Sequence, residues 1–89
     1  MRREGPRRAA LVYRRICDEQ PESATHFALL AAAWLAAGRR DEAIDALRTA
    51  VWLRMREGST GKAAALARML LALVDTDPTA ERALERAEV

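Results

Sequence analysis

Apolar residues recur at intervals of three and four along most of the chain, the spacing that places side chains on one face of an α-helix. Two apolar stripes are the clearest. The first comprises Phe27, Leu30, Ala31, Trp34 and Leu35, and the second comprises Ala43, Ile44, Leu47, Ala50 and Val51. Small and large residues alternate along both stripes, so two such helices can approach closely and interlock.

Residues of the types that begin helices stand at five places along the chain. They are Gly5-Pro6, Ser23, Asp41, Ser59 or Thr60, and Asp77-Pro78. A proline costs little in the first turn of a helix, and an aspartate or serine before that turn caps free backbone N–H groups. Pro21, Gly38 and Gly58 stand where helices should stop.

This punctuation predicts an all-α fold of about five helices, which pack as antiparallel hairpins because the connections are short. The predicted helices span about 6–19, 23–37, 41–57, 60–74 and 78–88. We expect residues 1–89 to form a single helical domain, since a chain of 89 residues has the size of one small domain.

The segment 56–62 reads REGSTGK and resembles a phosphate-binding loop. That motif needs a glycine where Arg56 stands, a hydroxyl where Ala63 stands, and a buried strand before it. The preceding residues, 43–55, have helical periodicity instead. We therefore interpret the segment as a turn between helices, in which Gly58 adopts the left-handed conformation.

Composition argues for a protein of the reducing cytoplasm. No run of about twenty apolar residues is present, so no membrane span is expected, and the N-terminus lacks the apolar core of a signal peptide. Cys17 is the single cysteine and cannot form an internal disulfide.

Charge is unevenly distributed, although the net charge is only +2. Residues 1–15 carry six arginines and one acid, whereas residues 75–89 carry five acids and two arginines. Solvated helix faces explain this pattern, and so does a surface that orients a partner or a second copy. Arg7, Arg8 and Arg14 are accordingly candidate interface residues.

The two stripes resemble the tetratricopeptide repeat, a 34-residue unit of two helices. Its first helix carries W-x2-L-G-x2-Y, and this chain has Phe27, Leu30, Ala31 and Trp34 at that spacing, followed by Gly38. The second helix carries A-x3-F-x2-A, and this chain has Ala43, Leu47 and Ala50. Met55 stands where the family has a proline.

The same frame extends in both directions along the chain. One repeat length upstream it meets Ala9, Tyr13, Ile16 and Pro21. The first helix therefore looks like the second half of a repeat whose first half is absent. Downstream, Ala80, Leu84 and Ala87 fit only if about three residues are inserted. We expect the insertion around 58–61, as an enlarged turn.

The resemblance implies a non-enzymatic protein–protein interaction module, an adaptor or a chaperone, which holds an apolar helical or extended partner segment in a concave groove. The family's groove positions fall on nine residues of this chain. They are Thr25, Ala28, Ala32 and Leu35 in the second helix, and Lys62, Ala65, Met69, Ala72 and Leu73 in the fourth. A clamp for acidic peptide ends is not expected, because the chain has no asparagine.

Other interaction modes remain open. The incomplete first repeat, together with Trp52 lying outside its helix stripe, suggests a homodimer or a hetero-complex. A self-assembling structural piece of a larger complex is an alternative. Nucleic-acid binding through the arginine-rich N-terminus is less favoured, because Tyr13 is the single aromatic residue among these arginines and base stacking uses several.

No catalytic, cofactor or metal site is expected. One cysteine and one histidine cannot make a zinc site. We expect His26 at the surface and Cys17 as a buried structural thiol. Asp41, Glu42 and Asp45 are interpreted as acids at the start of a helix, where they stabilise its dipole.

Overall fold

The computed structural model describes residues 4–88 and contains five helices within them. They are α1 (Glu4–Glu19), α2 (Ala24–Ala36), α3 (Arg40–Arg56), α4 (Thr60–Leu73) and α5 (Pro78–Glu88). The predicted all-α fold is confirmed, and each helix end lies within two residues of its expected position. Arg2, Arg3 and Val89 lie outside the described residues.

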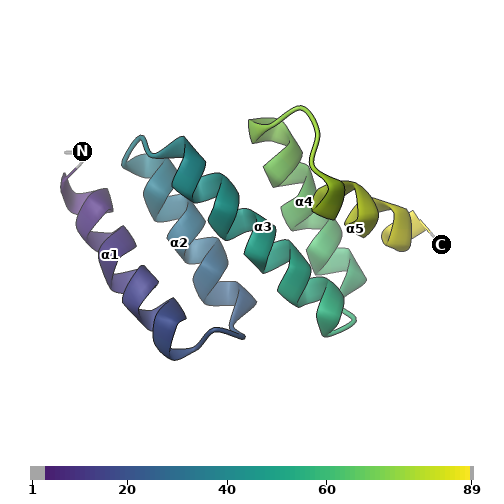
Figure 1. The fold of residues 1–89 in the computed structure, drawn as a ribbon, viewed down its shortest axis with the longest axis horizontal. Coiled ribbons are helices and arrows are strands. Elements are labelled where there is room, and N and C mark those ends of the chain that lie inside the picture. Colours follow the sequence, from purple (N-terminus) through teal and green to yellow (C-terminus); the bar gives the residue numbers. More distant parts are fainter. Residues whose placement is uncertain (1–3, 89) are drawn as a thin grey trace.

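Each helix packs antiparallel against its neighbour in sequence (Figure 1). α3 lies at the centre, between α2 and α4, while α1 packs on the far side of α2 and α5 contacts both α4 and α3. The result is a flattened molecule of 42 × 28 × 17 Å with α1 and α5 at its two ends.

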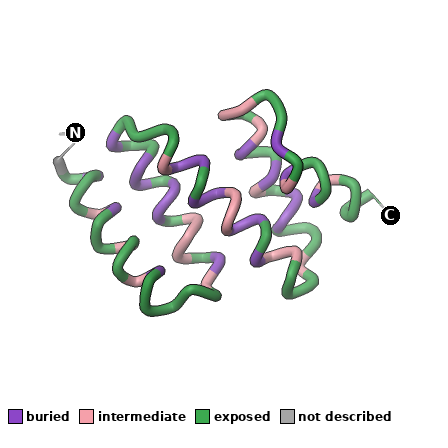
Figure 2. The backbone as a smooth tube through the Cα atoms, viewed as in Figure 1, coloured by how far each residue is buried: buried purple, intermediate pink, exposed green. Residues whose placement is uncertain are grey.

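Alanine dominates the core. Buried alanines line all five helices and let the backbones approach closely, while larger side chains such as Leu30, Trp34, Leu47 and Leu70 fill the remaining space. Figure 2 shows the buried positions along the backbone. Trp34 and Leu47 are therefore in the core, as the stripes predict. Phe27 is only partly buried and packs at the edge of the core.

Two helices end at glycines in the same way. Gly38 and Gly58 have φ of 78° and 82°. The N–H of Arg39 donates to the carbonyl of Trp34, and the N–H of Ser59 donates to the carbonyl of Arg54, both at 2.8 Å. This is the Schellman ending. The segment REGSTGK is thus a helix-ending turn followed by the first turn of α4, as expected.

The expectation of an enlarged turn at 58–61 is wrong. The connection 57–59 has three residues, as does the connection 37–39. The extra residues lie in α3, which continues past Met55 to Arg56, whereas α1 ends two residues before Pro21. Proline cannot continue a helix, so its absence at position 55 lets α3 run on.

Two of the predicted caps are confirmed. The hydroxyl of Ser23 accepts a hydrogen bond from the His26 N–H at 3.3 Å. Asp77 Oδ1 accepts hydrogen bonds from the N–H groups of Thr79 and Ala80, at 3.0 and 3.1 Å. Pro78 then occupies the first position of α5, where its missing N–H costs nothing.

Two other caps differ from expectation. The residue before α3 is Arg39, which makes no side-chain cap bond, so Asp41 does not cap this helix. The turn at Gly38 leads straight into α3 and places Asp41 and Glu42 in its first turn, where their charges favour the helix dipole. Ser59 precedes α4 but makes no side-chain cap bond either.

Asp77 also ties α5 to α3. Its carboxylate is buried, and Oδ2 accepts a hydrogen bond from Arg48 Nε at 2.7 Å. Burial raises the pKa of the Asp77 carboxyl, but the hydrogen bonds from Arg48, Ala80 and Thr79 and the charge of Arg48 outweigh it. The pKa of Asp77 therefore lies below its usual value. The hydrogen bond to Asp77 raises the pKa of Arg48.

Candidate functional site

The nine predicted groove residues all lie at the surface. Seven are exposed, and Ala28 and Leu73 are partly buried. On α2 and on α4 they follow the same spacing of three, four and three residues. These side chains are therefore available to a partner and do not form the core between stacked helices.

α2 has no Asp, Glu, Lys or Arg along its 13 residues. Six residues along one side of this helix are nevertheless exposed or partly exposed, and all but one of them are apolar. They are Thr25, Ala28, Leu29, Ala32, Leu35 and Ala36. A helix face in water normally carries charged residues, so an uncharged exposed face indicates a contact surface.

One hollow of about 370 Å³ lies between α2 and α4. It brings together four of the predicted residues: Thr25, Ala28, Lys62 and Ala65. Leu29, Arg54 and Leu66 complete its lining and were missed by the sequence. Leu29 and Leu66 lie one residue after a groove position on their helices, and Arg54 reaches the hollow from α3.

The other five predicted groove residues lie outside this hollow, farther along α2 and α4. They are Ala32, Leu35, Met69, Ala72 and Leu73. Met69 is 51% exposed, and Leu35 is exposed as well. These residues extend the apolar surface from the hollow toward the C-terminal ends of both helices.

One end of the hollow is polar and positive. Thr25 and Lys62 lie in the first turns of α2 and α4, where the helix dipoles are positive. Arg54 Nη2 donates to Thr25 Oγ1 at 3.0 Å, while its Nη1 lies 2.7 Å from Glu57 Oε1. Within residues 4–88 Lys62 forms no ion pair. The pKa of the Glu57 carboxyl is lowered chiefly by the hydrogen bond from Arg54 and to a lesser degree by the charge of Lys62, so Lys62 acts on Glu57 without a direct contact.

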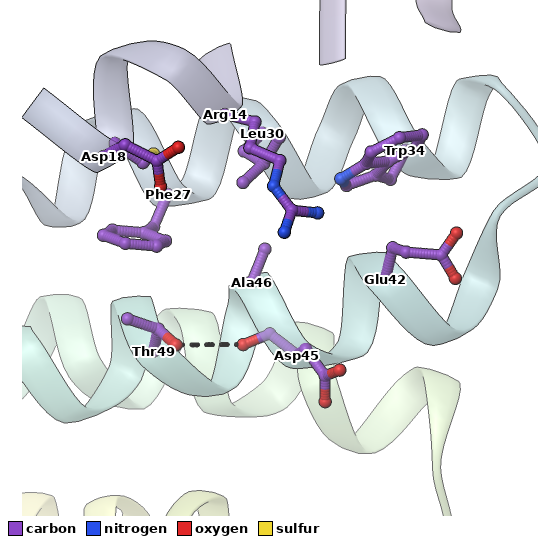
Figure 3. Close-up of a pocket in the computed structure, with 10 residues that line it drawn as sticks. Arg14, Asp18, Phe27, Leu30, Trp34, Glu42, Asp45, Ala46 and Thr49 are labelled. Carbon is purple, nitrogen blue, oxygen red and sulfur yellow. Dashed lines mark hydrogen bonds between the residues drawn. The ribbon is translucent and has the colours of Figure 1, made fainter. Parts of the chain in front are cut away.

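A second hollow, of about 260 Å³, lies between α1, α2 and α3 (Figure 3). Leu30 and Trp34 of α2 line it with Ala46 of α3, and the guanidinium of Arg14 points into it from α1. The carboxylates of Asp18, Glu42 and Asp45 lie around it. Its lining is of mixed charge, unlike the apolar lining between α2 and α4.

Cys17 also lines this second hollow, but it is buried. Burial, and to a lesser degree the charge of Asp18, raises the pKa of the Cys17 thiol. The thiol is therefore protonated at neutral pH, whereas a nucleophile or a metal ligand would be a thiolate. The expectation of a buried thiol is confirmed.

His26 differs from expectation, because it is partly buried and its Nδ1 atom is enclosed with no hydrogen-bond partner. Across residues 4–88, no three His, Cys, Asp or Glu side chains gather closely enough to hold a metal ion. Over the same residues, no helix is both long and apolar enough to cross a membrane.

The candidate interface residues occupy other parts of the surface. Trp52 is 50% exposed on α3, and the guanidinium of Arg56 lies 5.3 Å from the centroid of its ring. Arg7, Arg8 and Arg14 are exposed on α1. None of these four lines the hollow between α2 and α4.

Comparison of the chain with protein-family models, with curated proteins and with solved structures finds no match.

Proposed function

We propose that this chain is a non-enzymatic interaction module of the tetratricopeptide type, which binds an apolar partner segment along the face formed by α2 and α4. The observation that carries the proposal is the exposed and uncharged face of α2 beside the hollow that it shares with α4. Burying Leu29, Leu35 and Met69 against a partner would remove apolar surface from water, which is the main driving force of association.

Two features support the assignment to the tetratricopeptide type. Positions 9, 13 and 16 of α1 and positions 43, 47 and 50 of α3 share the 34-residue frame, and the three are partly buried on the edge helix α1 and fully buried on the central helix α3. The helices also pack in sequential antiparallel order, with α2 and α4 exposing the same pattern of small and apolar residues.

The positive end of the hollow gives the partner segment a direction. A segment with an acidic side chain next to its apolar residues would place the carboxylate near Lys62, at the first turns of α2 and α4. Its apolar residues would then run over Ala28, Leu29 and Ala65 toward Met69. Rim charge of this kind affects orientation more than affinity.

The test uses peptides selected on the intact protein from a random library and their dissociation constants for variants. Leu29→Glu should weaken binding at least about tenfold, because it places a charge in the apolar lining. Met69→Glu should do the same for peptides long enough to reach it. The matched control is Trp52→Glu, because Trp52 is about as exposed as Met69 but lies on α3.

Peptides that bind Leu29→Glu as tightly as the unchanged protein, yet lose affinity for Trp52→Glu, would move the site to α3 and refute the proposal. Circular dichroism of each variant checks that the helices are intact. All three substitutions replace exposed side chains, so the fold should tolerate them.

A further inference from the structure

α1 is an edge helix with one open side. The central helix α3 has α2 on one side and α4 on the other, whereas α1 packs against α2 and, within residues 4–88, has no helix beyond it (Figure 1). Because α1 and α3 share the 34-residue frame, residues of α1 have equivalents on α3. The residues of α3 that α2 covers therefore identify the equivalent residues of α1 that no helix of the described chain covers.

The side of α3 that faces α2 is defined by two contacts. Ala46 lines the hollow of Figure 3 together with Leu30 and Trp34 of α2, and Arg54 hydrogen-bonds to Thr25 of α2. The stripe Ala43, Ala46 and Ala50 on this side is fully buried.

The equivalent stripe on α1 is Ala9, Val12 and Ile16, 34 residues earlier. Val12 is 59% exposed, and Ala9 and Ile16 are only partly buried. The neighbouring residues Ala10 and Cys17, which match Ile44 and Val51 of α3, are buried as their counterparts are. α1 therefore has one filled side, toward α2, and one open side.

The two ends of the molecule differ in a way that bears on what covers α1. α5 ends the array with charged residues exposed to water, Glu81, Arg82 and Glu85 among them, as a terminal helix in a repeat array should. α1 instead exposes Val12 and Leu11, the two most exposed of the large hydrophobic residues. α5 therefore ends the array with a charged face, whereas α1 ends it with an apolar stripe between charged residues.

Charge specifies the partner further. Arg8 and Arg15 lie four residues before and three residues after Val12, so they flank the open stripe on the helix surface. Arg15 lies 3.8 Å from Glu19, but both side chains are mostly exposed, and such a pair is weak. Both arginines are therefore available to carboxylates of a partner.

We propose that the open stripe of α1 (Ala9, Val12 and Ile16) is a docking site for an amphipathic helix of another protein. The apolar residues of that helix, at helical spacing, cover the stripe as α2 covers α3, and its carboxylates pair with Arg8 and Arg15. This surface is separate from the face formed by α2 and α4.

In a second copy of the chain, α2, α4 and α5 do not supply such a helix. The exposed face of α2 has no acidic residue, and that of α4 carries Lys62 and Arg68. α5 has acidic residues, but its apolar residues Ala80 and Ala83 are buried.

The probe is a labelled synthetic peptide with the sequence of residues 22–38, since α2 covers the equivalent stripe of α3. In this peptide, glutamate replaces Leu29, Ala32 and Ala36, which are exposed on α2 in the protein. The residues of α2 that pack in the core are kept, and the three glutamates lie beside them. A control peptide carries lysine at these three positions. Fluorescence anisotropy gives the dissociation constants for the full chain.

The matched protein variants are Val12→Gln, within the open stripe, and Leu11→Gln, about 100° around the same helix. Neither adds a charge that could pair with Arg8 or Arg15. The acidic peptide should bind Val12→Gln at least about tenfold more weakly than the unchanged protein, and Leu11→Gln within about threefold of it. The lysine peptide should bind the unchanged protein at least about tenfold more weakly than the acidic one. The double variant Arg8→Glu, Arg15→Glu should reverse this preference.

Three results would overturn the proposal. One is equal affinity for Val12→Gln and Leu11→Gln, and another is no preference between the acidic and the lysine peptide. The third is self-association of the unchanged protein that Val12→Gln abolishes, which would make a second copy the occupant. Absence of saturable binding at about 1 mM peptide likewise counts against it.

Discussion

At the scale of single residues, Asp77 shows how one side chain can hold two parts of the chain together. Its carboxylate caps α5 and accepts a hydrogen bond from Arg48, which is 29 residues away in sequence. The cap could be predicted from Asp77-Pro78, since capping depends on residues close in sequence. The bond to Arg48 could not, since it depends on how α5 folds back toward α3.

Asp77→Ala should lower the free energy of unfolding by about 1–3 kcal/mol, because it removes a cap and a hydrogen-bonded ion pair. The loss stays below that of a fully buried pair, since the Arg48 side chain is 43% exposed and regains water. Urea unfolding measures it. Asp75→Ala, at an exposed neighbouring acid, should change stability by less than about 0.5 kcal/mol. Equal effects of the two substitutions would contradict this role of Asp77.

The same carboxylate gives stability a defined pH dependence. The pKa of Asp77 is lowered in the folded state, so between that value and the unfolded value near 4 the unfolded chain binds more protons. The contribution of Asp77 is therefore complete above about pH 4 and is lost as pH falls through the folded pKa. Relative to Asp77→Asn, the unchanged protein should lose stability across this acidic window. A parallel pH profile for the two proteins would contradict the lowered pKa.

The two tryptophans provide a second test at this scale. Trp34 is 6% exposed, so Trp34→Ala should cost about 3–5 kcal/mol through lost burial and a cavity. Trp52 is half exposed and stacks only with Arg56, so Trp52→Ala should cost about 1 kcal/mol or less. Thermal or urea unfolding compares the two variants. Similar losses from both would mean that Trp34 does not anchor the core.

At the scale of helices and turns, the sequence predicts well because local chemistry decides where helices stop. Gly38 and Gly58 end their helices in the left-handed conformation, and the helix ends fall close to their predicted places. The prediction that Asp41 caps its helix is wrong, because the turn at Gly38 makes Arg39 the residue before α3 and places Asp41 inside the helix. The prediction of an enlarged turn is wrong because position 55 is a methionine where the repeat has a proline. α3 therefore continues to Arg56, and the extra residues lie in the helix.

Substitution by alanine should change the stability of the protein in opposite directions at two glycines of the segment 56–62. Gly58 has φ of 82° and no atom within 4 Å of an added Cβ, so Gly58→Ala should destabilise by about 1 kcal/mol through backbone conformation alone. Gly61 lies in the first turn of α4, again with free space, so Gly61→Ala should stabilise by about 0.4–1 kcal/mol. Urea unfolding midpoints measure both. A change of the same sign in both variants would contradict the turn geometry.

At the scale of the whole molecule, the chain exposes an uncharged face on α2, next to α4. The groove positions implied by the tetratricopeptide resemblance include Thr25, Ala28, Lys62 and Ala65, which line the hollow, since helical spacing determines which face of a helix a residue occupies. It could not identify Arg54, which reaches the hollow from a third helix. That contribution depends on the angles between helices, which no single helix pattern encodes.

The most direct test of the account is hydrogen exchange of backbone amides with and without a peptide selected on the intact protein. We expect slower exchange in α2 (24–36) and α4 (60–73) when the peptide is bound, because the proposed binding face lies on these two helices. Exchange in α5 should change little. Slowing confined to α1, or to the part of α3 around Trp52, with α2 and α4 unaffected, would contradict the assignment of this face as the binding site.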